Sequence, residues 1–218
     1  MIINTDFIEL EYSEKDVEYI NELITYINYN SKEIVGFFGI TDFGQKVSIK
    51  LFDDLSIFRV ACGKIRKNEE VPLWLCGLSF CKNNKCIIYS LCLDEYKKTK
   101  GDSNDTLNQL KYLIMHEFIH ACHQKFTNNT KLPIWMSEGL ATTISHQYDN
   151  VKPSFNATLE QVINGGTDFK NYYTMFSYVL DNYGRNYILE LLKSKEYLEK
   201  VTPKLYEEVN LRYKQSIK

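Results

Sequence analysis

The sequence lacks long hydrophobic runs and any excess of basic residues, and histidine is rare. Its 218 residues carry a formal net charge of −2, which provides no positive field for a phosphate backbone. We therefore expect no nucleic-acid partner. No apolar stretch approaches bilayer length, and the first residues lack a basic segment followed by an apolar one. We expect a soluble, cytoplasmic protein without membrane insertion.

The cysteines form no Cys-x-x-Cys pair, which argues against a dithiol redox motif. In the absence of a recognisable leader we expect reduced and mostly buried thiols. Cys81 and Cys86 flank Lys82-Asn83-Asn84-Lys85, a good hairpin turn, and a cross-strand disulfide between them is the alternative in an oxidising compartment. The six cysteines are Cys62, Cys76, Cys81, Cys86, Cys92 and Cys122.

The first half of the chain mixes helical and strand patterns. A helix is predicted after the N-cap Ser13, with Asp16 completing a capping box. Alternation predicts a strand over 47–52, and a short helix is predicted over 55–62. Runs at 73–80 and 87–93 predict an antiparallel hairpin. Residues 97–106 are polar and predict a loop, with Asn104 or Asp105 as the cap of the next helix.

The second half of the chain is predicted to be helical. Gly184 is a good helix stop, and Pro203 suits a first helical turn. The predicted helices span 104–126, 137–146, 158–164, 170–183, 185–193 and 202–216. The fold class is therefore α+β, with lobes at 1–103 and 104–218 in one compact catalytic domain. We expect a small, mostly antiparallel sheet packed on the helix that carries His116, followed by a helical C-terminal lobe.

The segment His116-Glu117-Phe118-Ile119-His120 is the central chemical signal. Helix positions i and i+4 share one face, so both imidazoles can reach one ion. Glu117 lies about 100° around the helix, beside such an ion, where it can accept a proton from metal-activated water. The five-residue pattern is common by chance, so the context has to support it.

The context is the segment Pro133-Ile134-Trp135-Met136-Ser137-Glu138-Gly139-Leu140-Ala141. A catalytic zinc ion needs a third protein ligand and an open position for water. Glu138 lies in the predicted helix that follows a short loop, so its carboxylate can reach the two histidines. His116, His120 and Glu138 are the predicted metal ligands, and Zn²⁺ is the predicted cofactor.

His-Glu-x-x-His followed by Trp-x-x-Glu-Gly-x-Ala resembles the gluzincin metallopeptidases, the group of aminopeptidase N. The resemblance extends weakly over residues 77–192. It implies that His116, His120 and Glu138 bind zinc and that Glu117 is the general base. Two features depart from the family pattern. Seventeen residues separate His120 from Glu138, one fewer than in aminopeptidase N-like enzymes. The Gly-x-Met-Glu-Asn segment that binds a free amine is replaced by Gly77-Leu78-Ser79-Phe80-Cys81, which has no acid.

Such enzymes also use a Tyr or His to stabilise the oxyanion. Tyr173 is the preferred candidate, and Tyr172 and Tyr178 remain open. His123 would fill the open metal position if it were a ligand, so it is interpreted as lining the cleft or supporting the ligands. His146 is interpreted as a residue at a helix C-terminus. Thr142 either orients a ligand or packs.

The sequence therefore predicts a zinc-dependent peptidase acting on peptide or protein substrates, cleaving internally or as an oligopeptidase. The alternative is a non-catalytic zinc- or peptide-binding module with the same fold. Without the amine-binding acid, exopeptidase action is disfavoured unless Glu69, Glu70 or Glu95 supplies it. The oligomeric state, the specificity and the physiological role are left open.

Overall fold

The computed structural model describes residues 1–41, 43–67, 70–83, 85–103 and 105–214. The chain divides into two compact units, Met1–Cys122 and His123–Lys218. The division falls inside one helix, and most of that helix belongs with the sheet unit. The sequence predicts this division at 103/104, in the polar loop that precedes the helix. Among the described residues, no helix is long and apolar enough to cross a membrane.

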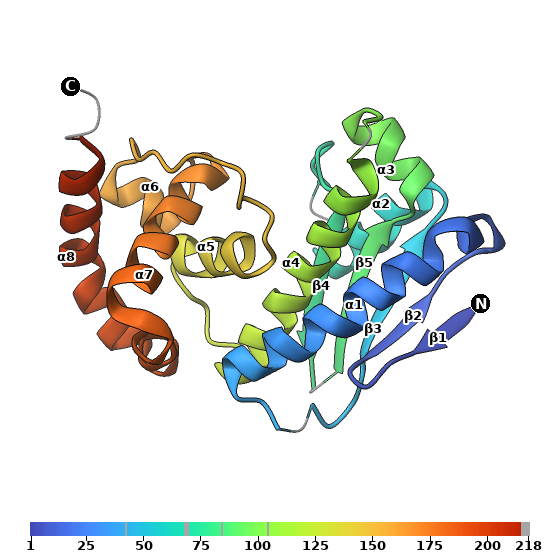
Figure 1. Cartoon of the computed structure of the whole chain (residues 1–218), viewed down its shortest axis with the longest axis horizontal. Helices are drawn as coiled ribbons and strands as arrows, with labels where there is room; N and C mark the ends of the chain where they lie inside the picture. The colour runs from blue at the N-terminus through green and yellow to red at the C-terminus, as the bar shows by residue number, and fades with distance from the viewer. Residues whose placement is uncertain (42, 68–69, 84, 104, 215–218) are drawn as a thin grey trace. The chain divides into compact units, whose positions relative to one another are not determined.

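The first unit contains a five-stranded sheet in the order β1-β2-β3-β5-β4 (Figure 1). Its strands are β1 (Ile2–Asn4), β2 (Ile8–Glu11), β3 (Val47–Phe52), β4 (Gly77–Lys82) and β5 (Lys85–Leu91). The outer pairs β1–β2 and β4–β5 are antiparallel, whereas β2–β3 and β3–β5 are parallel. The α+β class and the predicted hairpin are confirmed. The expectation of a mostly antiparallel sheet is wrong, because helices connect the inner strands and return the chain in the same direction.

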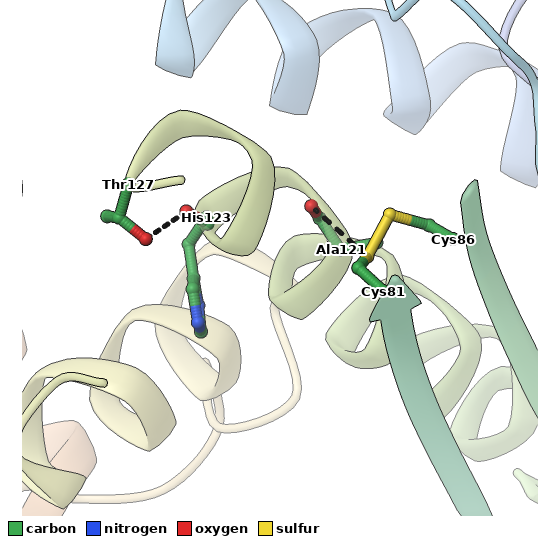
Figure 2. The surroundings of a disulfide bond; sticks show 5 residues. All are labelled: Cys81, Cys86, Ala121, His123 and Thr127. Carbon is green, nitrogen blue, oxygen red and sulfur yellow. Dashed lines mark hydrogen bonds between the residues drawn. A yellow bond between two sulfur atoms is a disulfide. The ribbon is translucent and has the colours of Figure 1, made fainter. Parts of the chain in front are cut away.

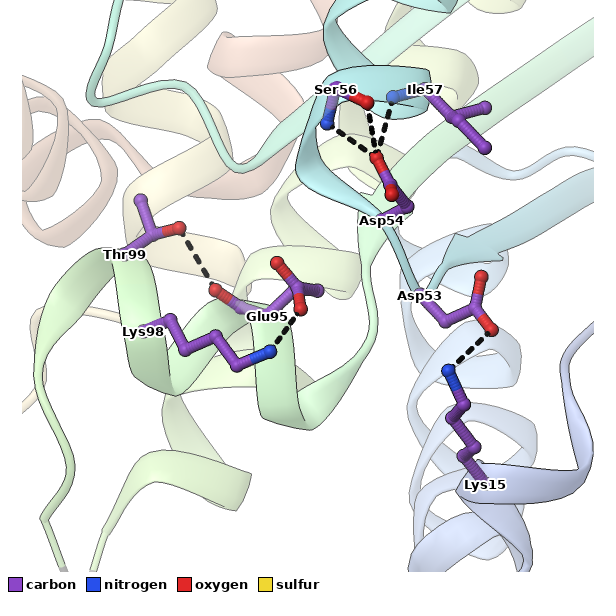
Figure 3. A network of polar contacts seen from close by, with 8 residues as sticks. All are labelled: Lys15, Asp53, Asp54, Ser56, Ile57, Glu95, Lys98 and Thr99. Atoms are coloured by element: carbon purple, nitrogen blue, oxygen red, sulfur yellow. Dashed lines mark hydrogen bonds and ion pairs between the residues drawn. The ribbon is translucent and has the colours of Figure 1, made fainter.

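The helices of this unit are α1 (Val17–Phe38), α2 (Leu55–Ile65) and α3 (Leu93–Lys100), together with most of α4 (Thr106–Phe126). Ser13 forms the predicted capping box with Asp16, at a short 3-10 turn that leads into α1. Asp54 caps α2 by accepting hydrogen bonds from the amides of Ser56 and Ile57 (Figure 3). The Asp54 cap explains why α2 begins at Leu55, whereas Asp16, the N-cap of α1, makes no side-chain cap hydrogen bond.

Two helical layers cover opposite faces of the sheet. Helices α1 and α4 share one face and contact each other, since Lys111 Nζ lies 2.6 Å from Glu22 Oε1. Helix α2 covers the other face, where Phe58 packs on Phe52 of β3 at a ring-centroid distance of 5.7 Å. Strand alternation assigns each sheet residue to one of these two layers. The core includes Ile8, Leu10, Ile49 and Ile88, all with zero exposure.

The second unit is helical, as predicted. It contains α5 (Ile134–Ile144), α6 (Leu159–Asn164), α7 (Phe169–Lys193) and α8 (Lys195–Lys214). Gly184 interrupts α7 with φ 76° and ψ 171°, so the predicted break is confirmed. Pro203 lies inside α8 rather than in its first turn, so that placement is wrong. Trp135 Nε1 donates a hydrogen bond to Thr202 Oγ1 at 3.3 Å and ties α5 to α8.

Several details differ from the sequence predictions. The short strands β1 and β2 were missed, although Ile8 and Leu10 alternate with glutamates. Helix α3 occupies the first part of the predicted loop at 97–106. Asn84 of the hairpin turn and Asn104, one of the two candidate caps, lie outside the described residues.

Candidate metal centre

Helix α4 places His116 and His120 one turn apart on one face. Their side chains are buried, with 6% and 9% exposure, and their rings meet edge-on at 81°. The two Nε2 atoms lie 3.0 Å apart. The apolar residues Ile114 and Phe118 are fully buried and fix the rotation of the helix. The local helix geometry therefore directs both imidazoles towards one point.

Glu117 lies between the two histidines in the sequence, on a neighbouring face of α4. Its side chain is 8% exposed and lies against Gly77 at the start of β4. A Cβ atom built at residue 77 would lie 3.1 Å from Glu117 Cγ and 3.1 Å from Leu113 Cδ1. A side chain at residue 77 would therefore require Glu117 or Leu113 to move by a few tenths of an ångström. In the sequence Gly77 stands out only because no acid follows it in that segment, and the contact with Glu117 depends on the fold.

Glu138 lies in the first half of α5, in the second unit. The next residue, Gly139, packs directly on α7. A Cβ atom there would lie 2.6 Å from Tyr172 O and 2.6 Å from Phe176 Cβ. Glycine is required at this crossing, and the crossing fixes where α5 presents the carboxylate of Glu138. Gly139 is thus needed for the packing of α5 on α7, next to Glu138, which is a candidate metal ligand.

His116, His120 and Glu138 form a group that could hold a metal ion. Their ligand atoms all lie within 4.8 Å of one another, and both histidines are buried while Glu138 is half-buried. Two imidazoles and one carboxylate are also a donor set that leaves positions open for water or substrate. The structure therefore brings together the three residues that the sequence singled out as ligands.

The tyrosine candidates on α7 have different surroundings. Burial raises the pKa of Tyr172, and the nearby negative charge of Glu138 raises it further. Burial also raises the pKa of Tyr173, which hydrogen-bonds to Ser177. Its ring lies 5.5 Å from that of Tyr148 between centroids, tilted by 33°. Tyr178 is half-buried. Of Tyr172 and Tyr173, only Tyr172 has Glu138 among the charges that shift its pKa, so the preference for Tyr173 stays a prediction.

The other polar residues near the motif take supporting positions. His123 is buried at 6% exposure in the last turn of α4, three residues before Phe126. His146 follows the end of α5 with φ 64°, and its Nδ1 lies 2.7 Å from Asp149 Oδ2. Thr142 donates a hydrogen bond to the Glu138 backbone oxygen at 2.7 Å. It therefore stabilises the helix turn that carries Glu138, a candidate ligand.

The hairpin is closed by a disulfide between Cys81 and Cys86, next to α4 (Figure 2). The two residues are directly opposite each other in the β4–β5 register. Cys81 Sγ lies 4.0 Å from the carbonyl oxygen of Ala121, one residue beyond His120. The expectation of six reduced cysteines is wrong for this pair, because the register brings the two side chains together. The remaining cysteines, Cys62, Cys76, Cys92 and Cys122, lie outside this disulfide and are buried, as expected.

Comparison with known proteins identifies no relative. No protein-family model matches the chain, and searches of curated proteins and of solved structures find no significant match. The geometry of the group and the chemistry of its residues are therefore the basis for a functional proposal.

Proposed function

We propose that the chain is a zinc-dependent peptidase, with His116, His120 and Glu138 as metal ligands and Glu117 as the general base. The observation that carries this proposal is the convergence of three ligand atoms within 4.8 Å, next to a buried glutamate on the same helix. Buried carboxylates and imidazoles are costly without a compensating charge or hydrogen bond. A divalent cation bound at this group would add a favourable charge interaction to those that these side chains already make.

The donor set suits zinc. Zinc is bound by imidazole nitrogen and carboxylate oxygen, whereas calcium and magnesium prefer oxygen ligands alone. Two nitrogens that each lie about 2.0–2.1 Å from a tetrahedral zinc ion are roughly 3.3 Å apart. The two Nε2 atoms here are 3.0 Å apart, so a shift of a few tenths of an ångström accommodates the ion.

The residues around the group have separate roles in peptide hydrolysis. Zinc, when bound, supplies Lewis acidity that lowers the pKa of a water molecule and polarises the scissile carbonyl. Glu117 accepts the proton of the attacking water and returns it to the nitrogen of the leaving amine. A tyrosine hydroxyl donates a hydrogen bond to the oxyanion of the tetrahedral intermediate. Tyr172 and Tyr173 are the residues to compare in this role.

The free edge of the sheet offers a place for an extended substrate. β4 is the last strand of the sheet, and Leu91 N donates to Cys76 O at 3.0 Å. In an antiparallel ladder the pairing alternates, so the backbone groups of Gly77, Ser79 and Cys81 point away from β5. A peptide added along this edge would satisfy those groups and pass beside Glu117 at Gly77.

Metal content tests the ligand assignment. Protein purified without chelator is expected to hold one zinc per chain by mass spectrometry, and His116→Ala to lose most of it. His146→Ala is the matched control, because His146 is exposed and lies outside the ligand group. Equal zinc in all three proteins would refute the ligand assignment.

Activity separates the peptidase from the rival non-catalytic module. Glu117→Gln is expected to retain zinc but to lose peptidase activity on a diverse peptide mixture, because an amide cannot accept the water proton. Tyr172→Phe and Tyr173→Phe, assayed beside it, identify the oxyanion donor. If the wild type holds zinc but cleaves no peptide, with and without chelator, the binding module is the better description.

Matched peptides with free and acetylated N-termini test the mode of cleavage. We expect internal cleavage of both, because no described acid is assigned to a free amine. Glu95 pairs with Lys98 on α3 (Figure 3), and Glu70 is exposed, while Glu69 lies outside the described residues. Trimming of only the free-amine peptides, one residue at a time, would show an exopeptidase instead.

A further inference from the structure

A second surface lies on the sheet face opposite α4. There α2 and the β4–β5 hairpin enclose a groove of about 550 Å³. Gly77 and Cys81 face α4, so strand alternation turns Phe80 and Lys82 to the other face. Phe80, Lys82 and Tyr89 all line the groove, which is consistent with this assignment. The groove is therefore separate from the candidate metal centre.

The floor and walls of the groove are apolar. On α2, Ile57, Val60 and Ala61 follow the i, i+3, i+4 spacing of one helix face, while Phe58 and Cys62 are buried against the sheet. Ile57 is 58% exposed and Val60 59% exposed. Contiguous exposed apolar side chains with polar neighbours are typical of interaction sites. Helix α2 thus exposes apolar side chains to water, which is unfavourable unless another molecule covers them.

Three lysines, Lys64, Lys67 and Lys82, line the same groove. No ion pair joins any of them to another described residue, whereas Lys15 pairs with Asp53 and Lys98 with Glu95 on the same unit (Figure 3). Lys64 lies in the last turn of α2, Lys67 lies two residues beyond that helix, and Lys82 is the last residue of β4. The groove therefore combines an apolar floor with three lysines that pair with no acid among the described residues.

We propose that this groove docks an acidic amphipathic segment of a partner protein. The apolar face of the segment would cover Ile57, Val60 and Phe80, and its carboxylates would pair with Lys64, Lys67 and Lys82. A protein segment fits better than a small amphiphile. Small-molecule sites bury most of their ligand, whereas the walls formed by Ile57 and Val60 stay more than half exposed.

The test uses the full chain and three labelled peptides in a fluorescence-polarisation titration. One is an 18-residue helical peptide with a Leu/Phe face flanked by glutamates, one has the same composition in scrambled order, and one replaces every glutamate by glutamine. We expect saturable binding of the first peptide, at least tenfold weaker binding of the other two, and weaker binding at higher salt.

Protein variants locate the binding surface. Val60→Asp and the triple variant with Lys64, Lys67 and Lys82 changed to Glu should each weaken binding at least tenfold. Val17→Asp is the control for the first, because Val17 is an exposed valine (51%) on α1. The control for the second changes three exposed lysines of the other unit to Glu: Lys131, Lys152 and Lys200. Circular dichroism establishes that each variant is folded.

Each outcome of these titrations either supports or contradicts the proposal. Binding that follows both the apolar face and the acidic rim of the peptide, and that only the groove variants lose, supports the proposal. Equal binding of the scrambled peptide, no binding of any peptide, or equal losses in the control variants overturns it. So does a groove that binds decanoate or anionic vesicles of phosphatidylglycerol but not the peptide. None of these results depends on zinc or peptidase activity.

Discussion

The crossing of α5 and α7 at Gly139 makes the sharpest prediction about the stability of the second unit. A methyl group at residue 139 would lie 2.6 Å from the backbone oxygen of Tyr172 and 2.6 Å from Phe176 Cβ. Ordinary contacts between carbon atoms are about 3.5–4.0 Å, so the two helices must separate by roughly an ångström. Overpacking of this kind costs about 2–3 kcal/mol.

The matched control is Gly36→Ala in α1. No heavy atom lies within 4 Å of a Cβ built there, and the residue is inside a helix. Alanine favours a helix over glycine by about 0.5–1 kcal/mol, so Gly36→Ala should stabilise the protein. The two glycine-to-alanine changes should therefore differ in sign, by about 3 kcal/mol in total.

Urea unfolding measures both variants, with the midpoint compared at equal slope. Zinc content is measured on the same preparations, because a shift of α5 also moves Glu138, the neighbour of Gly139. We expect Gly139→Ala to unfold at lower urea than the wild type and to hold less zinc. If it unfolds at the same midpoint as Gly36→Ala and holds full zinc, the close crossing of α5 and α7 is wrong.

Three further predictions follow from the first unit. Gly77→Ala should lower peptidase activity more than stability, since the added methyl displaces the Glu117 side chain by a few tenths of an ångström; unchanged activity would contradict the contact. The Ser56 hydroxyl and the cap amides lower the pKa of Asp54. The Asp54 carboxylate therefore stabilises the fold fully above the unfolded pKa of 3.8, and this stabilisation is lost as the pH falls through the lower folded pKa. The urea midpoint of Asp54→Ala, measured between about pH 2 and 6, should lack that pH dependence. Alkylation of unfolded, unreduced protein should label four of the six thiols, and all six after reduction; six labels without reductant would exclude the disulfide.

Local sequence patterns determined the elements that carry the chemistry. The i, i+4 spacing of His116 and His120 needs only a helix to bring the imidazoles together, and the apolar periodicity around them predicts that helix. The hairpin, the capping box at Ser13 and the break at Gly184 also depend on neighbouring residues alone. Each of these predictions involves side chains separated by a few positions, where the backbone geometry leaves few alternatives.

The tertiary structure decided what depends on distant residues. The parallel pairing of β2 with β3 joins segments separated by the whole of α1, and strand propensity does not encode such a partner. The same holds for Gly77 under Glu117, for Gly139 against α7 and for the lysines that share one groove. A glycine in a sequence shows that the backbone is unhindered, but only the folded chain shows which side chain approaches it. The candidate ligands could therefore be proposed from the sequence, whereas the contacts that position their side chains required the fold.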